Sequence, residues 1–203
     1  MKKQKRIIFV QGFGDYSDRK WPKWLGQEAV KNDFEFLNMQ MPDPMIPELY
    51  SWLEALQKEK NNLNEDTYFV GHSLGCITIV RFLETLPKKI KVGGCIFVAG
   101  FCDFPKIPLL ADFCVLPINW EKVKAVANNI FAIISDDDKM VPLIDAKNFA
   151  NKLGAEIILE NNKGHFMNDV KEMPSVLNCI LEMDQMQAEF REIKDLRKLS
   201  KKK

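Results

Sequence analysis

The segment Thr67–Val80, TYFVGHSLGCITIV, constrains the fold more than any other part of the chain. Its β-branched and aromatic start is typical of a buried strand, and its apolar second half has the spacing of a buried helix. Ser73 lies between them on a sharp turn, flanked by Gly71 and Gly75. Because glycine has no Cβ, these two positions allow helix and strand to pack closely around a strained serine. This context favours a serine nucleophile, and the alternative is a serine that only caps the helix.

Strands and helices are predicted to alternate along the rest of the chain. Apolar runs such as IIFV, CIFVA and IFAII are uninterrupted, as in strands whose sheet is covered on both faces. The predicted strands are Arg6–Val10, Glu35–Met41, Thr67–Val70, Val92–Ala99, Ile130–Ile134 and Glu156–Leu159. The predicted helices are Trp21–Lys31, Pro47–Lys60, Gly75–Leu86, Glu121–Val126, Pro142–Leu153 and Pro174–Glu182. This alternation predicts an α/β fold with a mostly parallel, doubly wound sheet of about six strands.

Length and composition fit one domain of a soluble globular protein. The chain has 203 residues, of which 46% are hydrophobic and 28% charged. A net charge of +1 provides no basic field for nucleic acid. No run of apolar residues is long enough to span a membrane, and IIFV after the basic start is too short for a secretory signal. We expect an α/β domain at residues 1–183 and a charged helical extension at residues 184–203.

The cysteine pattern argues against disulfides and against a zinc site. The five cysteines are odd in number, none forms a C-x-x-C pair, and most lie in apolar runs. A zinc site would need closer spacing and more histidines than the two present. We therefore expect reduced, mostly buried thiols in a cytoplasmic protein, with no metal and no cofactor.

The C-terminal stretch Asp184–Lys203 is rich in charge and can form a helix with apolar residues near one side. These residues are Met186, Phe190, Ile193, Leu196 and Leu199. A partly docked helix with a solvated basic end is favoured over a membrane or partner anchor. A protein partner is not indicated by the sequence.

A nucleophilic serine needs a base, and the chain offers only two histidines. His72 is adjacent to Ser73, so its side chain points elsewhere, and a packing or polar-surface role is expected. His165 follows the last predicted strand in the segment NKGHFMND. A loop at the carboxyl end of a strand is where this kind of fold places catalytic groups, so His165 is the predicted base.

The carboxylate that orients the base is expected between the serine and the histidine in the chain. Asp136, Asp137 and Asp138 follow the apolar strand IFAII, at the edge where catalytic loops gather. Because adjacent carboxylates repel one another, at least one of them should have a stabilising partner. A calcium loop is disfavoured, because its ligands alternate and its sharp turn needs a glycine.

Two backbone N–H groups are expected to bind an oxyanion, one from Leu74 and one from Phe13 in the glycine-containing loop after the first strand. The long segment Gly100–Trp120 has three prolines and many apolar residues, and a loop of this length is usually functional. It is expected to help shape an apolar acyl pocket. The candidate pocket residues are Gly12, Trp21, Trp24, Phe101, Phe104 and Met140. Phe13 is expected to help shape the pocket as well, and for any one of Phe13, Trp21 and Trp24 plain core packing is an equally good interpretation.

These motifs, together with INWEKVKAVANNI, SDDDKMVP and GHF, occur in a familiar order. From Arg6 to Glu182 the chain resembles the small, lidless α/β-hydrolases grouped with retinoblastoma-binding protein 9. The resemblance implies a three-layer α/β-hydrolase fold without a large cap domain. It also implies a triad of Ser73, Asp138 and His165, since the family's acid stands three residues before Val-Pro. Gln11 and Lys139 depart from the family pattern, where histidine and proline are common.

The resemblance implies a serine hydrolase that acts on a small-molecule acyl substrate. We expect it to cleave small carboxylic esters through an acyl-enzyme intermediate, with amides and thioesters as further candidates. Two alternatives stay open. One is a catalytically silent binding or scaffold protein with the same fold, and the other is an acyltransferase with the same triad.

Overall fold

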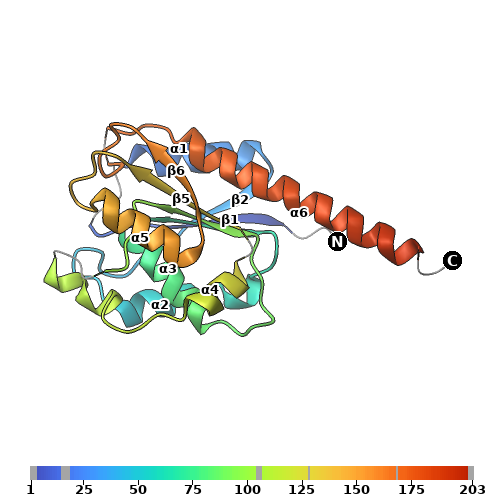
Figure 1. The fold of residues 1–203 in the computed structure, drawn as a ribbon, viewed down its shortest axis with the longest axis horizontal. Coiled ribbons are helices and arrows are strands. Elements are labelled where there is room, and N and C mark those ends of the chain that lie inside the picture. Colours follow the sequence, from blue (N-terminus) through green and yellow to red (C-terminus); the bar gives the residue numbers. More distant parts are fainter. Residues whose placement is uncertain (1–3, 15–18, 104–106, 128, 168, 201–203) are drawn as a thin grey trace.

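A computed structural model describes residues 4–14, 19–103, 107–127, 129–167 and 169–200. Its centre is one sheet of six strands, all paired in parallel, in the order β2-β1-β3-β4-β5-β6 (Figure 1). The strands are β1 (Lys5–Val10), β2 (Phe34–Asn38), β3 (Thr67–His72), β4 (Gly94–Val98), β5 (Ile130–Ser135) and β6 (Glu156–Glu160). The predicted α/β fold with a parallel sheet of six strands is confirmed.

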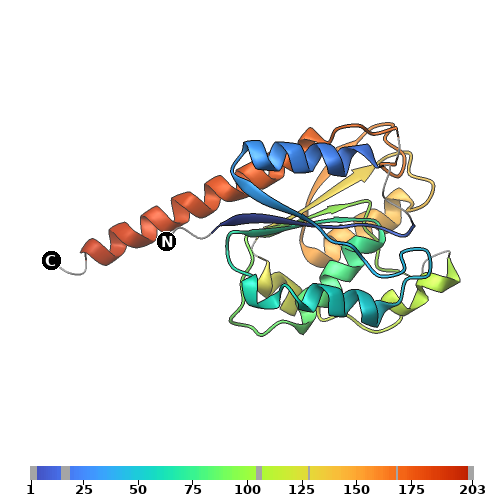
Figure 2. The ribbon, with the colours of Figure 1, turned by 180° about the vertical axis from the view of Figure 1, so that it is seen from behind.

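Helices cover both faces of the sheet and make three layers (Figures 1 and 2). One face carries α1 (Lys20–Lys31) and α6 (Pro174–Ser200). The opposite face carries α2 (Leu49–Gln57), α3 (Leu74–Thr85), α4 (Trp120–Val126) and α5 (Leu143–Leu153). Two short 3₁₀ helices, η1 (Lys60–Asn62) and η2 (Pro108–Phe113), lie in connections. A separate hydrophobic core fills the space on each side of the sheet, which explains the uninterrupted apolar strands.

Parallel strands bring distant segments together at one edge. The connections after β1, β3, β5 and β6 all leave the sheet at its carboxyl edge, because every strand runs in the same direction. The chain order reverses between β1 and β3, which is the position where ligands bind in open α/β sheets. Residues far apart in sequence therefore meet at this edge.

The segment between β4 and α4 contains only the short helix η2 and is held against the domain by hydrogen bonds. Arg81 of α3 is buried and donates hydrogen bonds to the carbonyl oxygens of Phe113, Leu116 and Pro117. These bonds fix the end of η2 to the helix that begins next to Ser73. No cap domain interrupts the part of the chain that the structure describes.

The helix predicted at Pro174–Glu182 and the helical extension predicted from residue 184 form one continuous helix, α6. Its first part is buried against the sheet, and the side chain of Arg191 forms an ion pair with Asp66 at 2.7 Å. Beyond Arg191 the helix side chains that are described are all exposed, and the helix projects from the domain (Figure 2). Among the described helices, none combines the length and the apolar character needed to cross a bilayer.

The predicted helix Pro47–Lys60 is shorter in the structure, because Glu48 keeps an extended backbone with ψ at 130° and the helix begins at Leu49. The predicted strand Val92–Ala99 is confined to Gly94–Val98. All five cysteines are free thiols, and only Cys114 among them is not fully buried.

Candidate active site

Ser73 lies at the turn between β3 and α3 in a strained backbone conformation. Its φ is +52°, a region that non-glycine residues rarely adopt. The two flanking glycines allow the backbone of neighbouring segments to approach this turn closely. A Cβ on Gly75 would lie 2.1 Å from the carbonyl oxygen of Val10, and one on Gly71 would lie 2.9 Å from Cys76 Cα. The turn therefore holds the serine hydroxyl at the carboxyl edge of the sheet, and strain of this kind often marks a functional site.

His165 connects Ser73 to Asp138 through two hydrogen bonds. The Nε2 atom of His165 lies 2.9 Å from the hydroxyl oxygen of Ser73, and its Nδ1 atom lies 2.7 Å from Asp138 Oδ2. All three side chains are at most 9% exposed. In the neutral tautomer that these contacts favour, Nδ1–H donates to the carboxylate and Nε2 accepts from the hydroxyl. The three residues come from the ends of β3, β5 and β6.

All three consecutive aspartates hold the loop that carries His165. Asp136 Oδ1 accepts from the backbone N–H of Asn162 at 2.9 Å, and Asp137 Oδ1 accepts from that of Gly164 at 2.7 Å. A hydrogen bond from the Ser135 hydroxyl and the one from Gly164 lower the pKa of Asp137. Asp138 contacts the imidazole itself. The loop N–H groups thus provide the stabilising partners expected for three adjacent carboxylates, and only Asp138 reaches the ring.

Asp138 is oriented through its second oxygen. Asp138 Oδ1 accepts backbone N–H bonds from Met140 at 2.8 Å and from Val141 at 3.0 Å. Both oxygens of this buried carboxylate are therefore engaged, which keeps Oδ2 directed at the imidazole.

His72 is completely buried and does not lie on the surface, so the polar-surface alternative for this residue is wrong. Its Nε2–H donates to the backbone carbonyl oxygen of His165 at 2.9 Å, and the two rings have centroids 5.1 Å apart. Burial first, and then the nearby His165, lower the pKa of His72 well below its usual value. The ring therefore stays neutral and keeps its position as a donor to the backbone of His165.

Trp21 holds the next peptide group. Its side chain is fully buried, and its Nε1–H donates to the carbonyl oxygen of Phe166 at 3.0 Å. Phe166 is itself fully buried and has a φ of +51°. Two consecutive carbonyl groups of the histidine loop are thus bound by buried ring N–H donors from β3 and α1. Trp21 belongs to the core beneath the site.

The two candidate oxyanion donors belong to different segments, the start of α3 and the loop after β1. Leu74 is the first residue of α3, so its N–H has no acceptor within the helix. Phe13 lies in the loop after β1 and lines the cavity described below. Gln11, the departure from the family pattern, is buried and donates from Nε2 to the carbonyl oxygen of Gly14 at 3.1 Å. Gln11 therefore stabilises the loop that carries Phe13.

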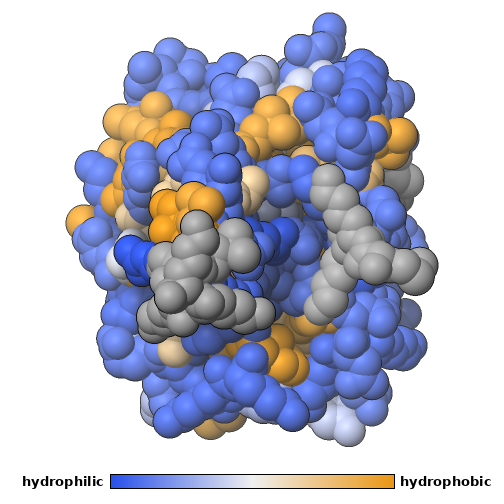
Figure 3. Space-filling view, turned by 90° about the vertical axis from the view of Figure 1, so that its right-hand side faces the viewer, coloured by the Kyte–Doolittle hydropathy of each residue, from blue (hydrophilic) through white to orange (hydrophobic). Residues whose placement is uncertain are grey.

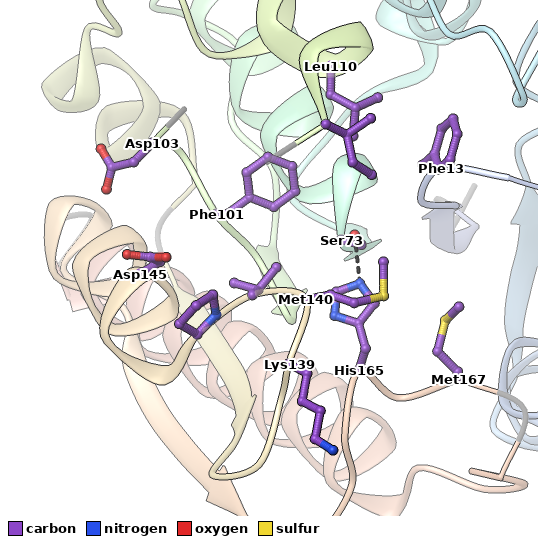
Figure 4. A pocket seen from close by; sticks show the side chains of 13 residues that line it. Phe13, Ser73, Phe101, Asp103, Leu110, Lys139, Met140, Asp145, His165 and Met167 are labelled. Atoms are coloured by element: carbon purple, nitrogen blue, oxygen red, sulfur yellow. Dashed lines mark hydrogen bonds between the residues drawn. The ribbon is translucent and has the colours of Figure 1, made fainter. Parts of the chain in front are cut away.

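A cavity of about 290 Å³ opens beside Ser73 and His165 (Figure 4). Its wall is mostly apolar. The other lining residues are Phe13, Phe101, Asp103, Ile107, Leu110, Lys139, Met140, Val141, Pro142, Asp145 and Met167. In Figure 4, Asp103 and Asp145 lie at the end away from Phe13 and Met167. An apolar space with the Ser73 hydroxyl at its side suits a small molecule with an apolar group.

Only part of the predicted pocket lines this cavity. Phe101 and Met140 do, whereas Gly12, Trp21 and Trp24 are not among the described residues that line it. Trp24 packs against the core between the sheet and α1. Phe104 lies outside the described residues. Trp21 is fully buried in the core between α1 and the sheet, which agrees with the alternative interpretation of core packing.

Comparison with known proteins decides the family. A family profile described as serine hydrolase matches residues 7–177. The chain belongs to the serine hydrolase family. It is 32% identical to YdeN of Bacillus subtilis (strain 168) over 166 residues, which are 81% of this chain and 87% of YdeN. It is 29% identical to the serine hydrolase RBBP9 of Rattus norvegicus over 178 residues, 86% of this chain and 94% of that one.

Solved structures agree with this placement of the serine hydrolase chain. The crystal structure of the B. subtilis ydeN gene product superposes with a TM-score of 0.86 at 30% identity, covering 89% of this chain and 99% of the other. A hydrolase is therefore the enzyme class of this protein. In the described part of the chain, no group of His, Cys, Asp and Glu side chains could hold a metal ion.

Sequence reasoning missed several cavity residues of this serine hydrolase. Val141 and Pro142 follow Asp138 closely, and Met167 lies two residues after His165, so proximity to the predicted triad could have identified them. Ile107 and Leu110 come from the long Gly100–Trp120 segment, whose general role was expected but whose inward-facing residues have no sequence signal.

Proposed function

We propose that this serine hydrolase cleaves small carboxylic esters with Ser73, His165 and Asp138 as a catalytic triad. The observation that carries the proposal is the hydrogen-bonded chain from Ser73 through His165 to Asp138 at the wall of an apolar cavity. A serine hydroxyl is a weak nucleophile until a base is within hydrogen-bonding reach. The 2.9 Å between Ser73 Oγ and His165 Nε2 meets that requirement.

Acylation follows from these contacts. Ser73 Oγ attacks the ester carbonyl carbon while its proton passes to His165 Nε2. Asp138 accepts from Nδ1–H and stabilises the imidazolium that forms. The carbonyl oxygen becomes an oxyanion, and the N–H groups of Leu74 and Phe13 are its proposed donors. When the intermediate collapses, the carbon–oxygen bond to the alcohol breaks, and the alcohol leaves with the proton from Nε2.

Deacylation repeats the same steps with water. His165 Nε2 removes a proton from a water molecule, whose oxygen attacks the acyl carbon. The bond to Ser73 Oγ then breaks, and the serine recovers its proton from the imidazolium. The products are the carboxylic acid and the free enzyme. Amides and thioesters can pass through the same steps with an amine or a thiol as leaving group.

The cavity supports an apolar acyl or alcohol group as the part of the substrate that is recognised. Phe101 and Leu110 form the apolar wall on one side of Ser73, and Met167 and Phe13 lie on the other side (Figure 4). Ile107, which directly precedes η2, also lines the cavity. The burial of each methylene contributes about 0.8 kcal/mol. We therefore propose esters with short to medium acyl chains as substrates. Because the enzyme has five free cysteines, we also propose the cytoplasm, where thiols stay reduced, as its location.

The test is labelling with a fluorophosphonate, which phosphonylates an activated serine. Wild type should be labelled and should hydrolyse p-nitrophenyl butyrate, whereas Ser73→Ala and His165→Ala should do neither. Asp138→Asn should retain the fold and lose about 10³- to 10⁴-fold in kcat, because the imidazole tautomer would be wrong. If folded wild type is not labelled, the protein is a silent member of the fold. If the acyl group goes to an added alcohol in preference to water, it is an acyltransferase.

A further inference from the structure

The projecting half of α6 has an apolar face that nothing in the described chain covers. Met186, Phe190, Ile193 and Leu196 are 47%, 64%, 49% and 60% exposed, respectively. Steps of four, three and three residues place these four side chains on one side of the helix. We call this set the apolar stripe. Exposed apolar residues that gather in this way mark an interaction surface more often than scattered single ones do.

The apolar stripe borders the face of α6 that contacts the domain, because Phe190 follows buried Met183 by two helical turns. That face is formed by Val176, Ile180, Met183 and Gln187, which are all buried. It continues to Arg191, which pairs with Asp66. The domain ends before it reaches the stripe, so the four side chains of the stripe stay exposed although α6 is docked. Figure 3 views the molecule from the end at which α6 projects, where hydrophobic side chains gather in only a few places on a hydrophilic surface.

Charge is distributed unequally along the same part of α6. Residues 184–192 contain three acidic side chains and one basic one, which gives a net charge of −2. Residues 193–200 contain three basic side chains and one acidic one, which gives +2. Three more lysines follow Ser200 in the sequence.

We propose that the apolar stripe binds the apolar stripe of a second copy of this chain, with the two α6 helices antiparallel. A two-fold axis between Phe190 and Ile193 brings the two stripes into register and places the acidic half of each helix beside the basic half of the other. A parallel pair would place like charges side by side, which is destabilising. The antiparallel pair is also closed, because the same surface is used by both copies.

An anionic lipid surface fits the stripe less well. Glu189 and Glu192 lie beside its apolar side chains in sequence, and the membrane-surface charge would repel them. Helices that lie on membranes usually have a polar face rich in Lys and Arg. The described residues 184–200 carry equal numbers of acidic and basic side chains. Only a partner with both signs of charge, in the opposite order, complements this helix.

The size of the stripe sets the expected affinity. Four partly exposed side chains per copy amount to roughly 400 Å² of apolar surface, or roughly 800 Å² for the pair. Specific interfaces usually bury more than about 1,000 Å² in total. We therefore expect a concentration-dependent dimer with a dissociation constant in the micromolar range. The projecting end of α6 lies on the side of the domain where β1 begins, away from the carboxyl edge and its cavity (Figure 1).

The test is sedimentation velocity of the full chain from about 1 to 200 μM, a range that brackets a micromolar dissociation constant. Wild type should shift from monomer to dimer, and Phe190→Glu should stay monomeric over the whole range. Ala188→Glu adds the same charge on another side of the helix and should dimerise like wild type. Both variants should keep the wild-type circular dichroism spectrum and the wild-type rate of ester hydrolysis.

Charge reversal tests the antiparallel orientation. Glu189→Lys with Glu192→Lys should weaken dimerisation at least about 10-fold, and so should Lys194→Glu with Lys198→Glu, because each leaves like charges opposed. A mixture of the two variants should form dimers again. Unchanged self-association of both variants would exclude the antiparallel pair.

Two further outcomes would overturn the proposal altogether. One is wild type that stays monomeric throughout the range. The other is monomeric wild type that binds phosphatidylserine vesicles through Phe190, which would assign the stripe to lipid. These measurements do not depend on hydrolytic activity, so the dimer and the proposed ester hydrolysis can fail separately.

Discussion

The ring of His72 donates a hydrogen bond to the backbone carbonyl oxygen of His165 at 2.9 Å. The residue before Ser73, the proposed nucleophile, therefore holds the backbone of His165, the proposed base, although 92 positions separate Ser73 from His165. Because the bond is buried, removing its donor leaves a carbonyl that water cannot reach. His72 is a positioning residue in this interpretation, and it does not take part in proton transfer.

Replacing His72 should therefore lower turnover more than substrate binding. His72→Phe keeps an aromatic ring but has no donor, and we expect kcat to fall about 10-fold with KM nearly unchanged. His72→Gln retains an N–H donor and should recover most of the loss. Steady-state kinetics with p-nitrophenyl butyrate would measure both effects. Full turnover in His72→Phe would show that the hydrogen bond does not position the base.

Stability should rise with pH because of the same residue. The pKa of His72 is well below its usual value in the folded chain, so the unfolded chain binds a proton near pH 6.5 that the folded chain does not. The free energy of unfolding should thus fall by up to about 2 kcal/mol between pH 6.5 and pH 5. Urea unfolding at several pH values would measure this change. His72→Gln should depend less on pH than wild type, and equal slopes would contradict the prediction.

Trp21→Phe should lower the free energy of unfolding although an aromatic ring still fills most of the site. The substitution keeps an aromatic ring against Phe9 but removes the donor to the Phe166 carbonyl oxygen. An unsatisfied buried carbonyl costs about 1–3 kcal/mol. Trp24→Phe is the matched control, since Trp24 is only partly buried, and its midpoint in urea should move less. Equal shifts would mean that packing, and not the hydrogen bond, accounts for the loss.

Ser73→Gly should be more stable than Ser73→Ala. Both variants lack the nucleophile and should be inactive, but only glycine adopts a φ of +52° without strain. The expected difference is about 1 kcal/mol in the free energy of unfolding. Thermal unfolding of the two variants side by side would measure it. An alanine variant as stable as the glycine variant would show that the turn stores no strain.

Acyl-chain preference should respond to Ile107. This residue is partly buried and lines the cavity, so Ile107→Ala should enlarge the space beside Ser73. The ratio of kcat/KM for octanoate to butyrate esters should rise by about 10-fold, since each methylene in an apolar pocket is worth about 1–3 kcal/mol. Leu109→Ala alters an exposed neighbour outside the described lining and should leave the ratio unchanged. If the ratio changed equally in both variants, the cavity would not be the acyl site.

Two features could be predicted from the sequence: the succession of strands and helices along the chain, and the edge of the sheet at which the candidate site lies. Apolar runs identify buried parallel strands, and parallel strands bring Ser73, Asp138 and His165 to one edge. The spacing of motifs does not reveal which way a helix turns its side chains. Trp21, a predicted pocket residue, therefore lies in the core and contacts Phe166. The bond from His72 on β3 to the backbone of His165 depends on the packing of two distant segments, which motif spacing does not show either.

Arg81 fixes part of the cavity wall before a substrate binds. It ties the end of η2 to α3, so the wall formed by this segment and the serine beside it belong to one rigid unit. A ligand that enters such a preformed site loses little affinity to the ordering of a mobile loop. Selectivity should then depend on shape, with bulky acyl groups rejected outright because the wall cannot swing aside to admit them.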